Sequence, residues 1–160
     1  MDKNYLSTQI AEALGWEQGV VEAEHRLMND GTLEFGMKRQ LQEIHSEDQR
    51  HVSTLQKVLD VVGRTGETES KIEQGREMAD QIVRLSGDDA LGLLKGTILA
   101  KYRSSDSAEM LYDLCDEMGE TDICDMFEQT LEEDQDQLDY LREQAILMSR
   151  ERIAGQPAAR

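Results

Sequence analysis

The sequence predicts an all-α protein, and both its composition and its periodicity support that fold class. Helix-favouring residues dominate the 160 positions, only 4% are aromatic, and the one proline, Pro157, stands near the C-terminus. Such a composition favours helices over strands. Apolar residues recur every three or four positions over long stretches, and no stretch alternates polar and apolar residues with a period of two. This length suits a single domain with one core.

The first half of the chain predicts a helical hairpin. A helix should run from about Leu6 to Met28, because apolar residues follow one face in steps of three and four. The segment "NDGT" (29–32) is a strong turn signal. A second helix should begin at Leu33 or Met37 and end at Val62. Its seam comprises Leu41, Ile44, Leu55, Val58 and Val62.

The second half predicts a short helix followed by another hairpin. Ser70 and Glu73 have the spacing of a capping box, which would open a helix ending near Leu85. Longer helices are expected from about 88 to 118 and from about 122 to 152, separated by "GET" (119–121). We therefore expect one helical bundle over residues 1–152 and a flexible tail over 153–160.

The arrangement of these helices is a four-helix bundle of a particular kind. Two antiparallel hairpins are joined by roughly 25 residues that contain the short helix, whereas a simple up-down bundle would need only a short loop. The predicted topology is therefore a pair of hairpins with one long crossover segment.

Charge and hydropathy exclude several partners. The chain has 34 acidic and 17 basic residues and a net charge of −17. Binding to nucleic acid through phosphate contacts, or to an anionic membrane surface, is not expected of such a chain. No apolar segment is long enough to span a bilayer, and the N-terminal stretch "MDKNYLSTQI" has no signal-peptide core. The expected location is the cytoplasm.

Polar residues interrupt the apolar seams, and one phrase does so twice. The segments "SEDQRHVSTL" (46–55) and "EEDQDQLDYL" (132–141) share Glu-Asp-Gln, with a Leu seven residues after the Asp. The first places Asp48 and His51 on the seam of its helix, and the second places Asp134 and Gln137 there. Because an isolated buried carboxylate is costly, these groups need partners, either a metal ion or an ion-pair network.

Counting residues from each turn predicts that these groups meet in one layer. At 1.5 Å per residue, positions equally distant from a turn lie at the same height in antiparallel helices. By that measure Glu17 on the first helix and Ser105 on the third match the polar pairs within about a turn. Lys101 lies one turn away, and Glu24 matches only if the first turn lies near Gly36. The predicted layer contains Glu17, Asp48, His51, Ser105, Asp134 and Gln137.

This layout resembles the ferritin-like superfamily, and more closely its small rubrerythrin-like members. The family pattern has a Glu on helices one and three and Glu-x-x-His on helices two and four, which together bind two iron or manganese ions. "IHSEDQRHVSTL" is similar to the helix-two motif, and "TLEEDQDQLDYL" is similar to the helix-four motif with Gln137 in the His position. The helix-three ligand would fall near Ser105, where no carboxylate stands; Asp106 is the nearest. The resemblance covers about Leu6 to Arg152 and implies a ferritin-like bundle with an incomplete dimetal centre.

Two functions follow as hypotheses. In the first, Glu17, Asp48, His51 and Asp134 bind one iron or manganese ion for oxygen, peroxide or metal-handling chemistry. In the second, the chain is a metal-free helical bundle that acts as an interaction or structural protein, as a dimer. Two positions stay open for the ammonium group of Lys101. It could extend to solvent, or it could replace a lost metal by forming an ion pair with Glu17, Asp48 or Asp134.

The remaining histidines and the apolar excess complete the predictions. His25, within a Glu-x-x-His at 22–25, is expected on the surface. His45, three residues before Asp48, is also expected there, with an outer-shell contact to the site as the alternative. Apolar residues beside the seams, such as Val21, Leu114 and Met126, motivate a homodimer, the commonest closed assembly.

Overall fold

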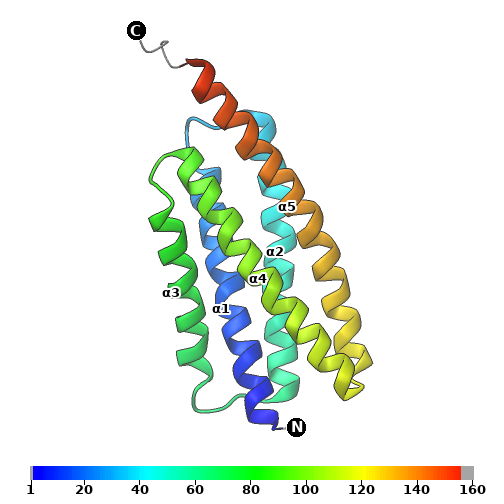
Figure 1. Cartoon of the computed structure of the whole chain (residues 1–160). Coiled ribbons are helices and arrows are strands. Elements are labelled where there is room, and N and C mark those ends of the chain that lie inside the picture. The colour runs from blue at the N-terminus through cyan, green and yellow to red at the C-terminus, as the bar shows by residue number, and fades with distance from the viewer. Residues whose placement is uncertain (1, 156–160) are drawn as a thin grey trace.

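A computed structural model describes residues 2–155 and shows five helices packed into one bundle (Figure 1). They are α1 (Lys3–Met28), α2 (Phe35–Val62), α3 (Thr68–Leu85), α4 (Ala90–Met118) and α5 (Thr121–Gly155). The all-α prediction is confirmed. Residues 156–160 of the predicted tail lie outside the described part, and α5 continues three residues beyond the predicted end at Arg152. In the described part no helix is long and apolar enough to cross a membrane.

The four long helices form two hairpins, and α3 connects them. In Figure 1 α1 and α5 run upward while α2 and α4 run downward, and α3 returns the chain from the end of α2 to the start of α4. Helix α3 packs against α1 and α4 but not α5. The predicted crossover segment is therefore a full-length helix on the outside of the bundle.

Close backbone contact holds α3 against α1. A side chain at Gly15 of α1 would collide with the Ile72 carbonyl of α3, and one at Gly75 would collide with the Glu12 carbonyl. The two helices can approach this closely only because neither position carries a Cβ atom. Even an alanine at either position would force the helices apart.

Local signals set the ends of α4, whereas the start of α3 differs from the prediction. Asp89 caps α4 by accepting a hydrogen bond from the Gly92 N–H at 2.8 Å, and Gly119 ends that helix in the left-handed conformation. Helix α3 begins at Thr68 and not at the predicted capping box. The Ser70 hydroxyl donates to the Glu67 carbonyl instead, so the helix is already formed at that residue.

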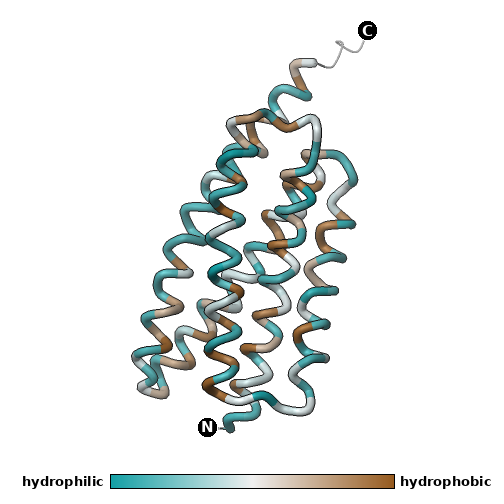
Figure 2. Tube along the Cα trace, turned by 180° about the vertical axis from the view of Figure 1, so that it is seen from behind, coloured by the Kyte–Doolittle hydropathy of each residue, from teal (hydrophilic) through white to brown (hydrophobic). Residues whose placement is uncertain are grey.

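The apolar core has two halves. One contains Trp16, Val20, Leu41, Ile44, Leu94 and Leu141, and the other contains Ile10, Leu14, Leu55, Val58, Leu111 and Phe127. On α2, α4 and α5 buried polar residues separate the two sets, while on α1 Glu17 and Glu24 lie among residues of the first set. A polar layer therefore crosses the bundle. Figure 2 shows brown apolar and teal polar positions interspersed along every helix, as expected for helices with one apolar face.

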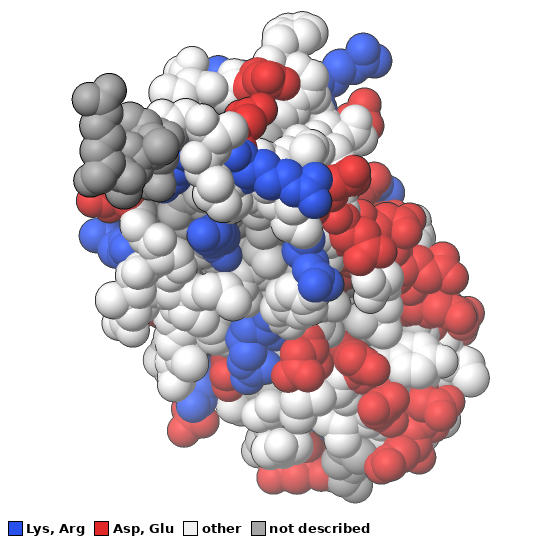
Figure 3. All heavy atoms as spheres, turned by 45° about the horizontal axis from the view of Figure 1, so that its top comes forward, with Lys and Arg blue, Asp and Glu red and all other residues white. Residues whose placement is uncertain are grey.

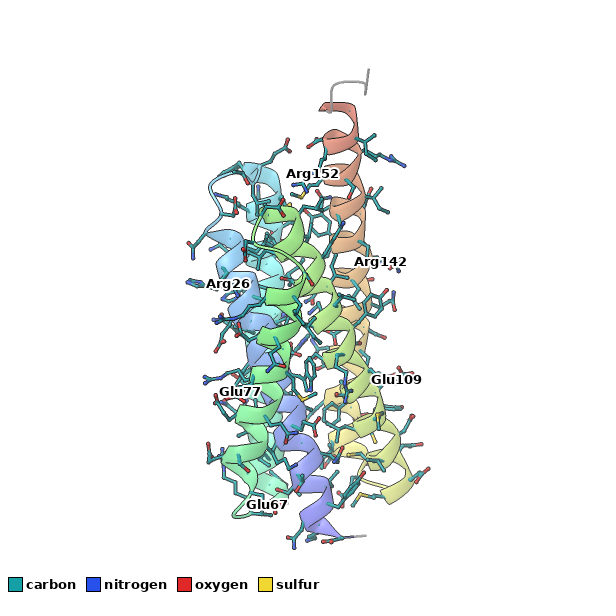
Figure 4. The ribbon with its side chains drawn as sticks, turned by 60° about the vertical axis from the view of Figure 1, so that its left-hand side comes forward. Arg26, Glu67, Glu77, Glu109, Arg142 and Arg152 are labelled. Carbon is teal, nitrogen blue, oxygen red and sulfur yellow. The ribbon has the colours of Figure 1, made fainter. Side chains whose placement is uncertain are left out.

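Charged side chains cover the outside. In Figure 4 the labelled Arg26, Glu77, Glu109 and Arg142 project away from the bundle axis. Figure 3 shows acidic groups gathered on the right of the molecule, where α5 lies in Figure 1, and a narrower band of Lys and Arg beside them. On the face seen in Figure 3 the acidic groups are therefore concentrated on one side.

Candidate metal centre

The polar layer contains buried side chains from all four long helices. At each helix these residues take seam positions that apolar residues occupy one turn above and below. All of them are at most 4% exposed, so none is solvated. The layer comprises Glu17 and Glu24 of α1, Asp48 and His51 of α2, Lys101 and Ser104 of α4, and Asp134 and Gln137 of α5.

Lys101 points into the layer and pairs with two carboxylates. Its Nζ lies 2.6 Å from Asp48 Oδ2 and 3.3 Å from Asp134 Oδ1. Burial alone would lower the pKa of this amine, but the carboxylates of Asp48 and Asp134 raise it well above its usual value. Burial would likewise raise the pKa of Asp48, but Lys101 holds it well below its usual range. Of the two positions left open for Lys101, the structure shows the interior ion pair.

His51 lies at the centre of the layer. Its Nδ1 is 3.3 Å from Asp48 Oδ1, 3.5 Å from Glu17 Oε1 and 3.7 Å from Asp134 Oδ1. Burial works against a charged imidazole, but the surrounding carboxylates of Asp48 and Glu17 raise the pKa of His51 to about 11. In the absence of a metal the ring is therefore an imidazolium that compensates these carboxylates.

Ser104, and not Ser105, completes the layer on α4. The Ser104 hydroxyl donates a hydrogen bond to Glu17 Oε2, whereas Ser105 is only partly buried. The prediction of Ser105 was wrong by one residue because the α4 seam steps from Lys101 to Ser104 to Ala108, in intervals of three and four.

Four buried oxygen and nitrogen atoms of the layer, each able to bind a metal ion, lie near one another and make no hydrogen bond. They are Glu17 Oε1, Asp48 Oδ1, His51 Nδ1 and Asp134 Oδ1. Glu17, Asp48 and His51 each offer one ligand atom within 4.8 Å of the others, which makes this trio a group that could hold a metal ion. Asp134, the fourth predicted ligand, lies beside the trio. Burial raises its pKa to about 7.

A second polar group adjoins the trio toward the α1–α2 turn. Glu24 is fully buried with both oxygens unpartnered, and burial together with the Asp48 carboxylate raises its pKa well above its usual value. Its Oε1 lies 3.5 Å from His45 Nδ1. The expectation that His45 is a surface residue was wrong, because its side chain turns inward and is only 14% exposed. His25 is exposed, as predicted.

Two outer carboxylates of the site were missed in the sequence. Glu133 Oε2 lies 2.8 Å from His51 Nε2, and Glu47 Oε2 accepts a hydrogen bond of 2.6 Å from Gln137 Nε2. Both residues immediately precede a buried aspartate, Asp134 and Asp48 respectively. Their position beside the apolar seam was the one feature of the sequence that indicated a role in the site. Because other acidic residues surround them in the sequence, they could not be told apart from the charged residues of a solvent-exposed helix face.

The structure therefore establishes an all-helical five-helix bundle with a buried Glu17, Asp48 and His51 group. It brings Asp134 and Gln137 to the same layer, at 1% and 3% exposure. Neither the known protein-family models nor the curated protein sequences include a match to this chain.

Proposed function

We propose that the chain is a ferritin-like metal protein that binds one divalent iron or manganese ion in this layer. Glu17, Asp48 and His51 would be its ligands, and Asp134 the fourth. The observation that carries the proposal is the convergence of their unpartnered donor atoms in a site closed to solvent. A buried polar atom without a partner is rare in folded proteins and calls for a ligand or another explanation.

Each ligand of the trio is held from behind by a second group. Ser104 binds the other oxygen of Glu17, Lys101 binds the other oxygen of Asp48, and Glu133 lies at the other nitrogen of His51. Metal-binding histidines commonly donate their second N–H to a carboxylate, and ligating carboxylates are commonly hydrogen-bonded in turn. The trio is thus oriented toward a common point before any ion arrives.

The charges of the layer also suit one divalent ion. Burial raises the pKa of Glu24 well above its usual value, so this carboxyl group is neutral. With His51 also neutral, the carboxylates of Glu17, Asp48 and Asp134 carry three negative charges, which Lys101 and a divalent ion would balance. Among residues 2–155 no second group of three such ligands is found. Ser104 and Gln137 stand where the family pattern has a carboxylate and a histidine. Mixed oxygen and nitrogen ligands suit Fe²⁺ or Mn²⁺, and bound iron would supply redox chemistry with oxygen or peroxide.

The course of the helices supports the ferritin-like part of the proposal. Helices α1 and α2 form one hairpin and α4 and α5 the other, while α3 spans the bundle between them. Each hairpin contributes half of the layer. This arrangement is the one expected of a bundle with a long crossover connection.

A metal-free structural role is the second candidate, and the Lys101 ion pairs favour it. With His51 protonated and Asp134 neutral, the two cations of the layer balance Glu17 and Asp48 without a metal. The two candidates therefore differ in the protonation of the layer. A metal ion must displace a proton from His51 and, at a pH at which Asp134 is protonated, a second proton from Asp134.

Titration of the metal-free protein with Fe²⁺ under anaerobic conditions, or with Mn²⁺, is expected to show one ion per chain. Binding should release about two protons below pH 7 and about one near pH 9, because the pKa values of Asp134 and His51 are about 7 and 11. Affinity should accordingly fall as pH decreases. Calorimetry in buffers of different ionisation enthalpy measures the proton count.

A titration that shows no stoichiometric uptake at any pH would contradict the metal proposal and favour the structural one. Uptake of two ions per chain would contradict the single-ion site. His25→Ala serves as the control, since His25 is exposed and contacts no member of the trio.

We also propose that the chain forms a homodimer. Val21, Leu114 and Met126 are partly buried within the bundle, so they are not its outward face. Exposed apolar residues occur on all five helices, and those on α4 and α5 include Leu99, Tyr102 and Ile146. Light scattering is expected to give twice the 18.2 kDa chain mass, and replacing Leu99 and Ile146 with Gln should shift the protein toward monomer. A monomeric mass for the unmodified protein at micromolar concentration would oppose this proposal.

A further inference from the structure

A cavity of about 270 Å³ lies between α2 and α5, on the outer side of His51. The two helices pack less extensively against each other than any other neighbouring pair in the bundle. Arg50, Ser53, Thr54 and Lys57 line the cavity from α2, and Met126 and Glu133 are among the residues that line it from α5. Its volume fits a small molecule rather than a single water.

The charge of this cavity is opposite to that of the protein. Arg50 and Lys57 bring two cations to it, although the chain carries a net charge of −17. In the described structure no carboxylate lies within ion-pair distance of Lys57, and Arg50 has only a long contact of 3.8 Å with Glu133. Two cations left without close partners in so acidic a chain favour an anionic ligand.

Glu133 is the one carboxylate that lines the cavity, and it is already occupied. Its Oε1 accepts a hydrogen bond of 2.9 Å from Gln129, and its Oε2 lies 2.8 Å from His51 Nε2. These contacts hold the carboxylate at the base of the cavity, between His51 and the opening. Glu133 therefore does not neutralise both cations, and the lining retains a positive charge.

The polar groups of the lining suit an oxyanion. The Arg50 guanidinium presents several N–H donors, Lys57 supplies an ammonium, and Thr54 adds a hydroxyl group on the same wall, whereas the Ser53 hydroxyl donates to the Gln49 carbonyl. Met126 gives the opposite wall an apolar surface. We propose that this cavity binds a small oxyanion, a phosphate or a short carboxylic acid, held by Arg50 and Lys57.

A ligand there would lie beside the buried trio, because His51, a member of the trio, lines the cavity together with Glu133. The site does not require a metal, because all of its proposed contacts are made by side chains of the cavity. Its presence or absence can therefore be tested on the metal-free protein, independently of the metal proposal.

The test is a titration of metal-free protein with inorganic phosphate and, separately, with butyrate, followed by the backbone amide signals in NMR spectra. Ionic strength is held constant with sodium chloride. We expect saturable shifts at residues 50–57 and 126–133 with at least one probe. Stronger binding of butyrate would identify a carboxylic acid that uses the Met126 wall, and stronger binding of phosphate would identify a phosphate group.

Arg50→Gln and Lys57→Gln should each weaken binding at least about tenfold, as expected for loss of a charge-assisted hydrogen bond. Arg39→Gln is the matched control, because it makes the same change of charge on α2. Arg39 lies about 16 Å from Arg50 along the helix and does not line the cavity. The proposal is overturned if neither probe gives saturable shifts, or if the Arg39 variant weakens binding as much as the other two.

Discussion

Replacing Lys101 with Met is expected to lower the free energy of unfolding of the metal-free protein by about 3–5 kcal/mol. The side chain is 1% exposed, and its ammonium lies 2.6 Å from Asp48 and 3.3 Å from Asp134. Methionine can fill the space of the lysine stem but leaves the carboxylates without their cation. Breaking a buried ion pair is costly because an uncompensated charge stays in the core. Equilibrium unfolding in urea measures the change.

The matched control is Lys95→Met, on the same helix but exposed. A surface substitution of this kind should change stability by less than about 0.5 kcal/mol. If Lys101→Met were equally mild, the ion pairs of Lys101 would not stabilise the fold, and the charge balance of the layer would have to be drawn differently.

Replacing His51 with Ala is expected to abolish stoichiometric binding of Fe²⁺ or Mn²⁺. The ring supplies the only nitrogen ligand of the trio and is the group nearest to all three carboxylates. Loss of an outer-shell partner alone lowers metal affinity about 10–100-fold, so loss of the ligand itself should exceed that. Calorimetric titration of the variant and of the unmodified protein gives the comparison.

His25→Ala controls for the loss of an imidazole as such, and it should leave metal affinity unchanged. Circular dichroism of both variants establishes that the helices are intact. Equal affinity of His51→Ala and the unmodified protein would show that the ion binds elsewhere, for example to acidic groups on the surface.

The helices and the depth of the central residues could be predicted from the sequence. The apolar seams repeat at 3.6 residues over long stretches, so the seam positions of Asp48, His51, Asp134 and Gln137 placed them in the interior, and all four are buried. Counting residues from the two short turns then placed these four residues at the same height along the bundle axis. These steps needed only periodicity and rise per residue.

The packing of α3 could not be predicted in the same way. Its capping-box signal indicated a start at Ser70, whereas Thr68 begins the helix. Its contact with α1 depends on Gly15 and Gly75 lying opposite one another. Glycine spacing was visible in the sequence, but which helix faces which is decided only when the long helices assemble.

The outer parts of the site depend on geometry that periodicity does not contain. Ser104 and Ser105 are adjacent and point about 100° apart on α4, so the rotation of this helix about its axis decides which of them faces Glu17. Glu133 and His45 lie at the edges of their apolar seams. At such positions the angle at which neighbouring helices cross decides whether a side chain points into the bundle or toward solvent. Sequence patterns therefore identify the centre of the layer better than its rim.

The most direct test of the central claim is a crystal structure of the protein grown with Mn²⁺ or Fe²⁺, with data collected at the absorption edge of the metal. The proposal predicts a single anomalous peak within metal–ligand bonding distance of Glu17, Asp48 and His51 Nδ1, with Lys101 still bound to Asp48. A layer without an anomalous peak, in which His51 donates its Nδ1 proton to the carboxylates at saturating metal, would contradict it.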